Sequence, residues 1–307
     1  MTHFADRLGS AIVGKRTPVL VGLDPRAKSL PAGLLAAEDA NNPVAVANAY
    51  RTFCRGVIDA VAPLAAVVKP QAAFFEELGP AGMAALADVI VDAREQGLLV
   101  ILDGKRNDIG STAEAYASAY LGRDSAWGAD ALTVSPYLGD DSLAPFIERC
   151  RTHDAGIFVL VKTSNPGGGT FQDRAIDGRP LYEHVAELVE QQAAATSAEC
   201  GYGAVGAVVG ATYPEQLTSL RMQMPHAWLL VPGYGAQGAG ARDVAGAFDD
   251  SGLGAIVNSS RGIIFAHARA PYSESYGAAR WQDAVAAAAR DMIEQLKSET
   301  PAGRLFP

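Results

Sequence analysis

Cysteine is scarce in this chain of 307 residues, which contains only Cys54, Cys150 and Cys200. The three are odd in number, lie far apart and form no CxxC pair, so a disulfide framework is not expected. Reduced thiols of this kind are typical of packing residues in a cytoplasmic protein. We therefore expect a cytoplasmic chain whose fold depends on its hydrophobic core.

Basic residues are also in short supply, because 25 Lys and Arg stand against 34 Asp and Glu, for a formal net charge of −9. Surfaces that bind nucleic acid hold phosphates with clustered Lys and Arg, so no nucleic-acid partner is expected. The apolar runs end well short of the roughly 20 residues that a membrane span needs. Residues 1–16 mix charged and apolar positions and lack the apolar core of a secretory signal. The sequence predicts a soluble protein in which any phosphate ligand meets a small local site.

A Gly-rich dinucleotide turn is missing after the first apolar run, where GLDP stands at 22–25. Instead, short apolar runs recur at intervals, and each is followed by an Ala-rich segment with helical spacing. Runs this apolar suggest parallel strands buried on both faces. Eight such units without a linker predict an α/β fold, a single (β/α)8-barrel domain over 1–307. The predicted strands are 18–24, 65–69, 98–103, 130–134, 156–161, 204–210, 227–233 and 253–258.

Local signals mark some of the connections. Asn42 and Thr112 precede helical segments, and their side-chain oxygens are expected to cap free N–H groups there. The longest irregular stretch, 165–180, follows the fifth predicted strand and is rich in Gly. Long loops in compact domains are often functional, so this stretch is a candidate lid, although a plain surface insertion explains it nearly as well.

Charged residues gather where the predicted strands end, which is where barrel enzymes place their active sites. Lys69, Asp103, Lys105 and Asp108 form a set that alternates in sign. One such residue could simply be a rim charge, but grouped charges at neighbouring strand ends are costly unless they are paired or used. Other polar residues that close predicted strands are Asp24, Lys162, Thr163, Ser164, Asn258, Ser259, Ser260 and Arg261.

Asp103 and Lys105 are two residues apart, so their side chains are expected on the same side of the strand if strand geometry persists. A carboxylate and an ammonium attract each other more strongly in the barrel mouth than in bulk water. A lysine paired in this way stays protonated and can serve as a general acid. Asp108 is expected to reach the same network, from this subunit or from a neighbour.

A second cluster is typical of a phosphate site. The seventh predicted strand runs into PGYGAQG at 232–238, and the eighth ends in NSSRG at 258–262. These are the two positions where many barrels bind phosphate with loop N–H groups and the start of a short helix. Arg261 adds a forked donor that suits phosphate oxygens.

The segment DGKRNDIGST, at 103–112, resembles the D-x-K-x-x-D-I motif of orotidine 5'-phosphate decarboxylases. Further segments resemble the same family, in its long bacterial branch, and the resemblance covers roughly 18–265. They are VGLDP (21–25), VVKPQAAFFE (67–76), TVSPYLGDDSL (133–143), VKTSNPG (161–167), VPGYGAQGA (231–239) and NSSRGI (258–263).

The resemblance implies decarboxylation of orotidine 5'-monophosphate to UMP in pyrimidine biosynthesis, with no cofactor and no metal. It implies a charged network at C6 of the pyrimidine, in which Lys105 protonates C6 beside Lys69, Asp103 and Asp108. It also implies a homodimer with shared active sites. In the family, the second Asp of the motif and a nearby Thr reach into the active site of the partner subunit, and here these residues are Asp108 and Thr112. The implied substrate contacts are Asp24 for the ribose, Ser164 for the base, and Gly235, Gln237, Asn258 and Arg261 at the phosphate end.

The sequence departs from the commoner short form of the family in the long 165–180 stretch and in Gly104. Neither change removes a charged residue of the motif. Both bear on how the site closes over the base.

Three other functions fit parts of the pattern. A Mg²⁺-dependent sugar-phosphate decarboxylase or aldolase of the same superfamily shares D-x-K-x-x-D, but it needs a carboxylate where Lys69 stands. A Schiff-base aldolase using Lys105 or Lys162 needs a neutral lysine, which the flanking Asp103 and Asp108 disfavour. A non-catalytic barrel that binds a nucleotide phosphate needs only the phosphate loops. The presence of Lys69, Asp103, Lys105 and Asp108 together therefore disfavours this function.

Overall fold

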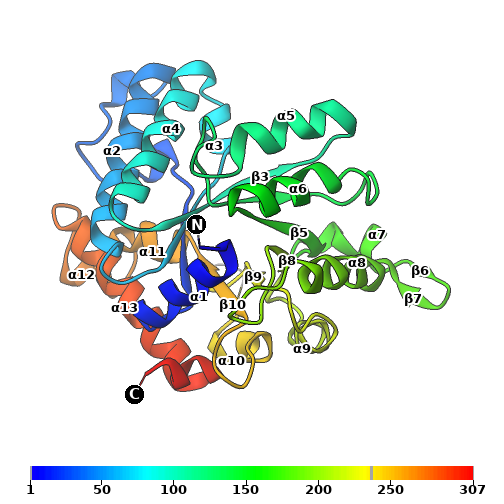
Figure 1. Cartoon of the computed structure of the whole chain (residues 1–307). Helices are drawn as coiled ribbons and strands as arrows, with labels where there is room; N and C mark the ends of the chain where they lie inside the picture. The colour runs from blue at the N-terminus through cyan, green and yellow to red at the C-terminus, as the bar shows by residue number, and fades with distance from the viewer. Residues whose placement is uncertain (1, 236–237, 307) are drawn as a thin grey trace.

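The computed structural model describes residues 2–235 and 238–306, and in this part of the chain parallel strands close into a barrel surrounded by helices (Figure 1). Strand β1 pairs with β2 on one side and with β10 on the other, which closes the barrel. The predicted (β/α)8 fold and its eight predicted strands are confirmed. The barrel strands are β1 (Val19–Leu23), β2 (Val67–Pro70), β3 (Leu99–Arg106), β4 (Ala131–Val134), β5 (Gly156–Lys162), β8 (Val205–Val209), β9 (Leu229–Val231) and β10 (Ala255–Ser259).

Helices connect successive strands on the outside of the barrel (Figure 1). The α-helices are α1 (Phe4–Lys15), α2 (Pro43–Val61), α3 (Ala73–Glu76), α4 (Gly79–Glu95), α5 (Gly110–Tyr120), α6 (Ala144–His153), α7 (Gly169–Gln172), α8 (Leu181–Ala195), α9 (Pro214–Gln223), α10 (Ala241–Val244), α11 (Arg261–Ile264), α12 (Tyr272–Ser275) and α13 (Trp281–Glu299). Short 3-10 helices cover Ala27–Ser29, Ala37–Asp39, Pro166–Gly168, Ala245–Ala247, Ala266–Ala268 and Pro301–Leu305. None of the helices in the described ranges combines the length and the apolar character that crossing a membrane requires.

One of the two predicted caps is confirmed. The Oδ1 atom of Asn42 accepts hydrogen bonds from the backbone N–H groups of Val44 (3.1 Å) and Ala45 (3.4 Å) at the start of α2. The prediction for Thr112 is wrong, because α5 begins two residues earlier and Thr112 lies within its first turn. Gly110, with a φ of 52°, makes the turn from the end of β3 into that helix.

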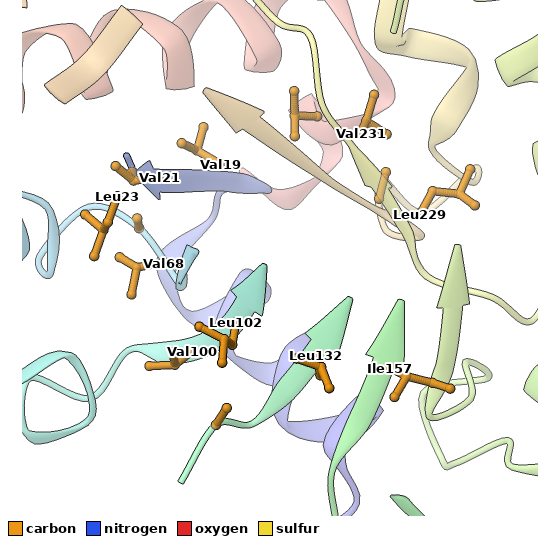
Figure 2. Packing of buried hydrophobic residues seen from close by; sticks show 14 of the residues in the cluster. Val19, Val21, Leu23, Val68, Val100, Leu102, Leu132, Ile157, Leu229 and Val231 are labelled. Atoms are coloured by element: carbon orange, nitrogen blue, oxygen red, sulfur yellow. The ribbon is translucent and has the colours of Figure 1, made fainter. Parts of the chain in front are cut away.

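The hydrophobic core has two layers, because alternate residues of each strand point to opposite faces. The outer layer lies between the sheet and the helices and includes Val19, Val21 and Leu23 of β1 (Figure 2). The inner layer fills the amino-terminal half of the barrel, where Phe4 and Leu8 of α1 join inward-facing side chains such as Phe158 and Trp228. Within the barrel, the space at the carboxyl ends of the strands is therefore left for a site.

The stretch 165–180 is more ordered than predicted. It contains a 3-10 turn, α7, and a small antiparallel hairpin of β6 (Ala175–Ile176) and β7 (Arg179–Pro180), which extends away from the barrel in Figure 1. Asp177 and Gly178 both have positive φ, 51° and 80°, as a two-residue hairpin turn of type I′ requires. The Asp-Gly pair was the sequence signal for this hairpin, and the prediction of an irregular loop was wrong.

The three cysteines are free, as expected from their number and spacing. Cys54 and Cys150 are buried, and burial raises the pKa of both thiols. Cys200 is partly buried, and its pKa is raised to about 11, mainly by burial. All three therefore stay protonated at neutral pH, in keeping with a packing role.

Candidate active site

A cavity of about 430 Å³ opens at the carboxyl ends of the barrel strands. All eight barrel strands, or the residues that directly follow them, contribute to its wall. The apolar part of the lining is formed by Leu160, Val208, Leu230 and Pro232, and polar groups form the rest. The polar residues are Asp24, Lys69, Gln71, Asp103, Lys105, Thr133, Thr163, Ser164, Asn165 and Asn258.

Asp103 is the centre of a charged cluster in this cavity. Its Oδ2 atom lies 2.7 Å from Nζ of Lys69, and its Oδ1 atom lies 2.7 Å from Nζ of Lys105. The side chains of Lys69 and Asp103 are 5% and 11% exposed, whereas that of Lys105 is 47% exposed. The buried pair thus fixes the carboxylate, and the second ammonium reaches from it toward the open space.

The pair of Asp103 and Lys105 is confirmed, but the backbone between them is not a regular strand. The pairing of β3 with β4 shifts between Leu102 and Arg106, and Lys105 has a left-handed φ of 44°. A left-handed residue other than glycine costs about 1–2 kcal/mol. The Lys105 N–H donates a hydrogen bond to Oγ1 of Thr133 (2.9 Å), which helps to hold this conformation.

Thr133 also completes the environment of the central carboxylate. Its Oγ1 donates a hydrogen bond to Oδ1 of Asp103 (2.8 Å) while it accepts the N–H of Lys105. Sequence reasoning missed this residue. Its inward position on β4, directly beside the Asp103 strand, was the available signal.

The cluster holds Asp103 and Lys69 in their charged forms. Burial by itself raises the pKa of Asp103, but the charges and hydrogen bonds of Lys69 and Lys105 outweigh it and hold that pKa well below the ordinary range. Burial by itself lowers the pKa of Lys69, because it disfavours the charged form of a lysine. The charges of Asp103 and Asp24 outweigh burial, and the net shift of the Lys69 pKa is upward. Asp103 is therefore a carboxylate and Lys69 an ammonium at neutral pH.

Two residues of the motif do not join this cavity in their own chain. Asp108 is partly buried, and its Oδ1 accepts a hydrogen bond from the neighbouring Ile109 N–H (2.9 Å). Thr112 is exposed on the first turn of α5. Neither residue lines the cavity.

Polar atoms at the ends of the neighbouring strands β1 and β10 are available to a ligand. Asp24 Oδ1, Asn258 Oδ1 and Ser260 Oγ are buried and have no hydrogen-bond partner within the described ranges. Asp24 and Asn258 line the cavity. Buried polar atoms are costly unless they meet a partner, so these two favour a ligand rich in hydroxyl or amide groups.

The predicted phosphate end is only partly described. Gly235 is exposed with a φ of 72°, and Arg261 is exposed at the first residue of α11. Asn258 lines the cavity from the end of β10. Gln237 lies outside the described residues.

Ser164 lines the cavity together with Thr163, which the sequence already placed among the polar residues at strand ends, and with Asn165, which it did not single out. The close approach of β8 requires a glycine here, because a Cβ atom on Gly210 would lie 2.8 Å from Cβ of Ser164. Gln71, two residues after Lys69, is a further lining residue that was missed. Its spacing after Lys69 was the available signal.

The side chain of Lys162 points away from the cavity. Its side chain is 3% exposed, forms an ion pair with Asp173, and lies 5.1 Å and 5.4 Å from the ring centres of Tyr182 and Tyr213. It does not line the cavity. Lys162 is therefore no candidate for a Schiff-base lysine in this site.

A family model described as "Orotidine 5'-phosphate decarboxylase / HUMPS family" matches residues 17–276 of the chain. The chain belongs to the orotidine 5'-phosphate decarboxylase / HUMPS family. A curated relative from Rhodopirellula baltica named orotidine 5'-phosphate decarboxylase is 58% identical over 97% of this chain and 100% of its own length. A relative of the same name from Deinococcus radiodurans is 44% identical over 86% of this chain and 89% of its own.

Solved structures of the orotidine 5'-phosphate decarboxylase family agree with the fold. The OMP decarboxylase of Leishmania donovani superposes with a TM-score of 0.74 at 36% identity, covering 97% of this chain and 98% of the other. The family description names two groups, orotidine 5'-phosphate decarboxylase and HUMPS, and the residues that line the cavity bear on the choice between them. Among the described residues, His, Cys, Asp and Glu side chains form no group of three or more that could hold a metal ion.

Proposed function

We propose that this chain decarboxylates orotidine 5'-monophosphate to UMP without a cofactor, in de novo pyrimidine biosynthesis. The cluster of Lys69, Asp103 and Lys105 carries this proposal, because it sets a fixed carboxylate between two ammonium groups at one wall of the cavity. A metal-dependent enediolate mechanism needs carboxylate ligands at the strand ends. Here β2 presents an ammonium instead.

The cavity suits a nucleotide bound along its length. Asp24 would accept a hydrogen bond from a ribose hydroxyl through its unpartnered Oδ1. Ser164 would contact the base from the opposite wall. Gly235, Gln237, Asn258 and Arg261 would hold the phosphate through loop N–H groups and the Arg261 guanidinium.

The chemistry would follow from charge placement. The C6 carboxylate of the substrate would lie beside Asp103, and cleavage of the bond between C6 and this carboxylate would release CO2 and leave the electron pair on C6. The ammonium of Lys105 would stabilise the developing negative charge and then donate its proton to C6. Lys105 would regain a proton from water, while Lys69 keeps Asp103 in place.

Remote binding would drive this step. Contacts to the phosphate, far from the reacting carbon, can be used to bring the substrate carboxylate close to Asp103. A substrate without its phosphate should therefore lose catalytic rate as well as affinity.

We also propose a homodimer with shared active sites. Asp108 and Thr112 lie outside the cavity of their own chain, at a surface where the neighbouring Ile109 is 56% exposed. An apolar side chain beside such a carboxylate favours burial against another chain. Asp108 of one subunit would then complete the charged network of the other. The free thiols fit the reducing cytoplasm, where we expect the enzyme to act.

The test is a spectrophotometric assay of EDTA-treated protein with orotidine 5'-monophosphate, with Lys105→Ala as the control. Metal-free conversion to UMP that the variant lacks is the expected result. No conversion by folded wild type, together with Mg²⁺-dependent activity on a sugar phosphate, would instead assign the chain to the HUMPS side of its family.

A further inference from the structure

Two neighbouring residues at the end of β5 are bound to two neighbouring residues at the end of α7. Gln172 makes a double hydrogen bond with Thr163: its Oε1 accepts the Thr163 N–H (3.0 Å), and its Nε2 donates to Thr163 Oγ1 (2.8 Å). The next residue, Asp173, forms an ion pair with Lys162. We call these four residues the β5–α7 clamp.

The Lys162 arm of the clamp lies on the outer side of the strand. The ammonium is almost fully buried, and the rings of Tyr182 and Tyr213 lie within 5.4 Å of it. A desolvated ammonium is costly without a carboxylate partner, although the two aromatic faces offset part of that cost. The Asp173 carboxylate supplies the missing charge and ties the half-exposed end of α7 to the barrel.

The Gln172 arm of the clamp reaches the cavity wall. Thr163 donates its hydroxyl hydrogen to Oδ1 of Asn165 (2.6 Å), and Thr163, Ser164 and Asn165 all line the cavity. The position of these three side chains thus depends on a residue of α7 that does not itself line the cavity.

We propose that Lys162, Gln172 and Asp173 are positioning residues that hold the turn 163–165 in the conformation that binds the pyrimidine base. This inference rests on the proposed function. A turn that is already ordered loses less conformational entropy on binding than a mobile one, so the clamp strengthens binding at the base end. It does not act on the phosphate end, which other loops form.

The test compares Asp173→Asn, which removes the charge with little change in shape, with Asp173→Glu, which keeps the charge. Arg179→Ala is the matched control, because it removes exposed ion pairs of the same segment, with Glu183 and Glu187, and leaves the clamp intact. KM and kcat are measured with orotidine 5'-monophosphate. Inhibition constants are measured for UMP and for ribose 5-phosphate, which lacks the base.

Asp173→Asn should raise KM and weaken inhibition by UMP by about tenfold, the equivalent of about 1.4 kcal/mol. Inhibition by ribose 5-phosphate should stay unchanged, and Asp173→Glu and Arg179→Ala should behave like wild type. Partial unfolding alone would lower the apparent kcat without changing KM. If Asp173→Asn is not recovered folded, the same constants are measured for Gln172→Ala, which breaks the other arm of the clamp. The same changes in KM and in UMP inhibition are then expected.

A wild-type KM in the variant, or an equal loss of ribose 5-phosphate and UMP binding, would overturn the positioning role while decarboxylation by the wild type still stood. Wild-type protein that does not turn over the substrate at all would instead overturn the proposed function, and the inference with it.

Discussion

The Lys69 ammonium lies 2.7 Å from the Asp103 carboxylate in a wall of the cavity where both side chains are almost buried. Breaking such a pair by removing one partner commonly costs about 3–5 kcal/mol, because the other charge is left buried and unpaired. Asp103→Asn should therefore lower the free energy of unfolding by about 3 kcal/mol as well as abolish turnover. Urea denaturation followed by circular dichroism measures the first effect, and the absorbance assay measures the second.

The stability provided by Asp103 should depend on pH in a defined direction. Its pKa is lower in the folded chain than the ordinary value of about 3.9, so the unfolded chain binds the proton more tightly. Its contribution is complete above that ordinary value and is lost as the pH falls toward the folded pKa. The difference in stability between wild type and Asp103→Asn should shrink from pH 5 toward pH 3, and a constant difference would contradict the assignment.

Lys105 should be required for chemistry rather than for binding. Its ammonium is the most exposed member of the cluster and the one placed toward the open cavity. General acid catalysis contributes about 10²–10⁴-fold, and electrostatic stabilisation of C6 adds to it, so Lys105→Ala should lose more than about 10³-fold in kcat. UMP should still bind within a few-fold of wild type by calorimetry. Substantial residual turnover would rule out the acid role.

The sequence predicted the barrel because its strands are apolar on both faces and its charged residues sit at their ends. It also predicted that Asp103 and Lys105 meet. It did not predict how, because the left-handed backbone at Lys105 depends on Thr133 from another strand. The sequence also did not predict that the Lys162 side chain points away from the cavity. The contacts that bury this side chain come from Asp173 and from two tyrosines later in the chain.

Thr133 offers a test of how finely the cluster is positioned. Thr133→Val keeps the shape of the side chain but removes the hydroxyl that bonds Asp103 and the Lys105 N–H. A lost hydrogen bond to a charged group costs about 1.5–3 kcal/mol, so kcat/KM should fall about tenfold to a hundredfold. Thr133→Ser, which keeps the hydroxyl, should retain most of the activity. Equal losses in the two variants would point to packing rather than hydrogen bonding.

The proposed sharing of active sites predicts that two inactive variants restore each other. Lys105→Ala and Asp108→Asn homodimers should each be inactive, but subunit exchange forms hybrids. In such a hybrid, the Lys105 of one chain and the Asp108 of the other make one intact site. Random exchange of equal amounts should therefore restore about a quarter of wild-type activity, because half of the dimers are hybrids with one working site of two.

The control for this experiment mixes Lys105→Ala with Asp103→Asn. These residues contact each other within one chain, so every hybrid site keeps one of the two defects, and no activity should return. Recovery in the first mixture and not in the second would show that Asp108 acts across the interface. Mass spectrometry of labelled chains verifies that subunits exchange. If they exchange and the first mixture still regains no activity, Asp108 does not act in the partner's site, and the shared active site is contradicted.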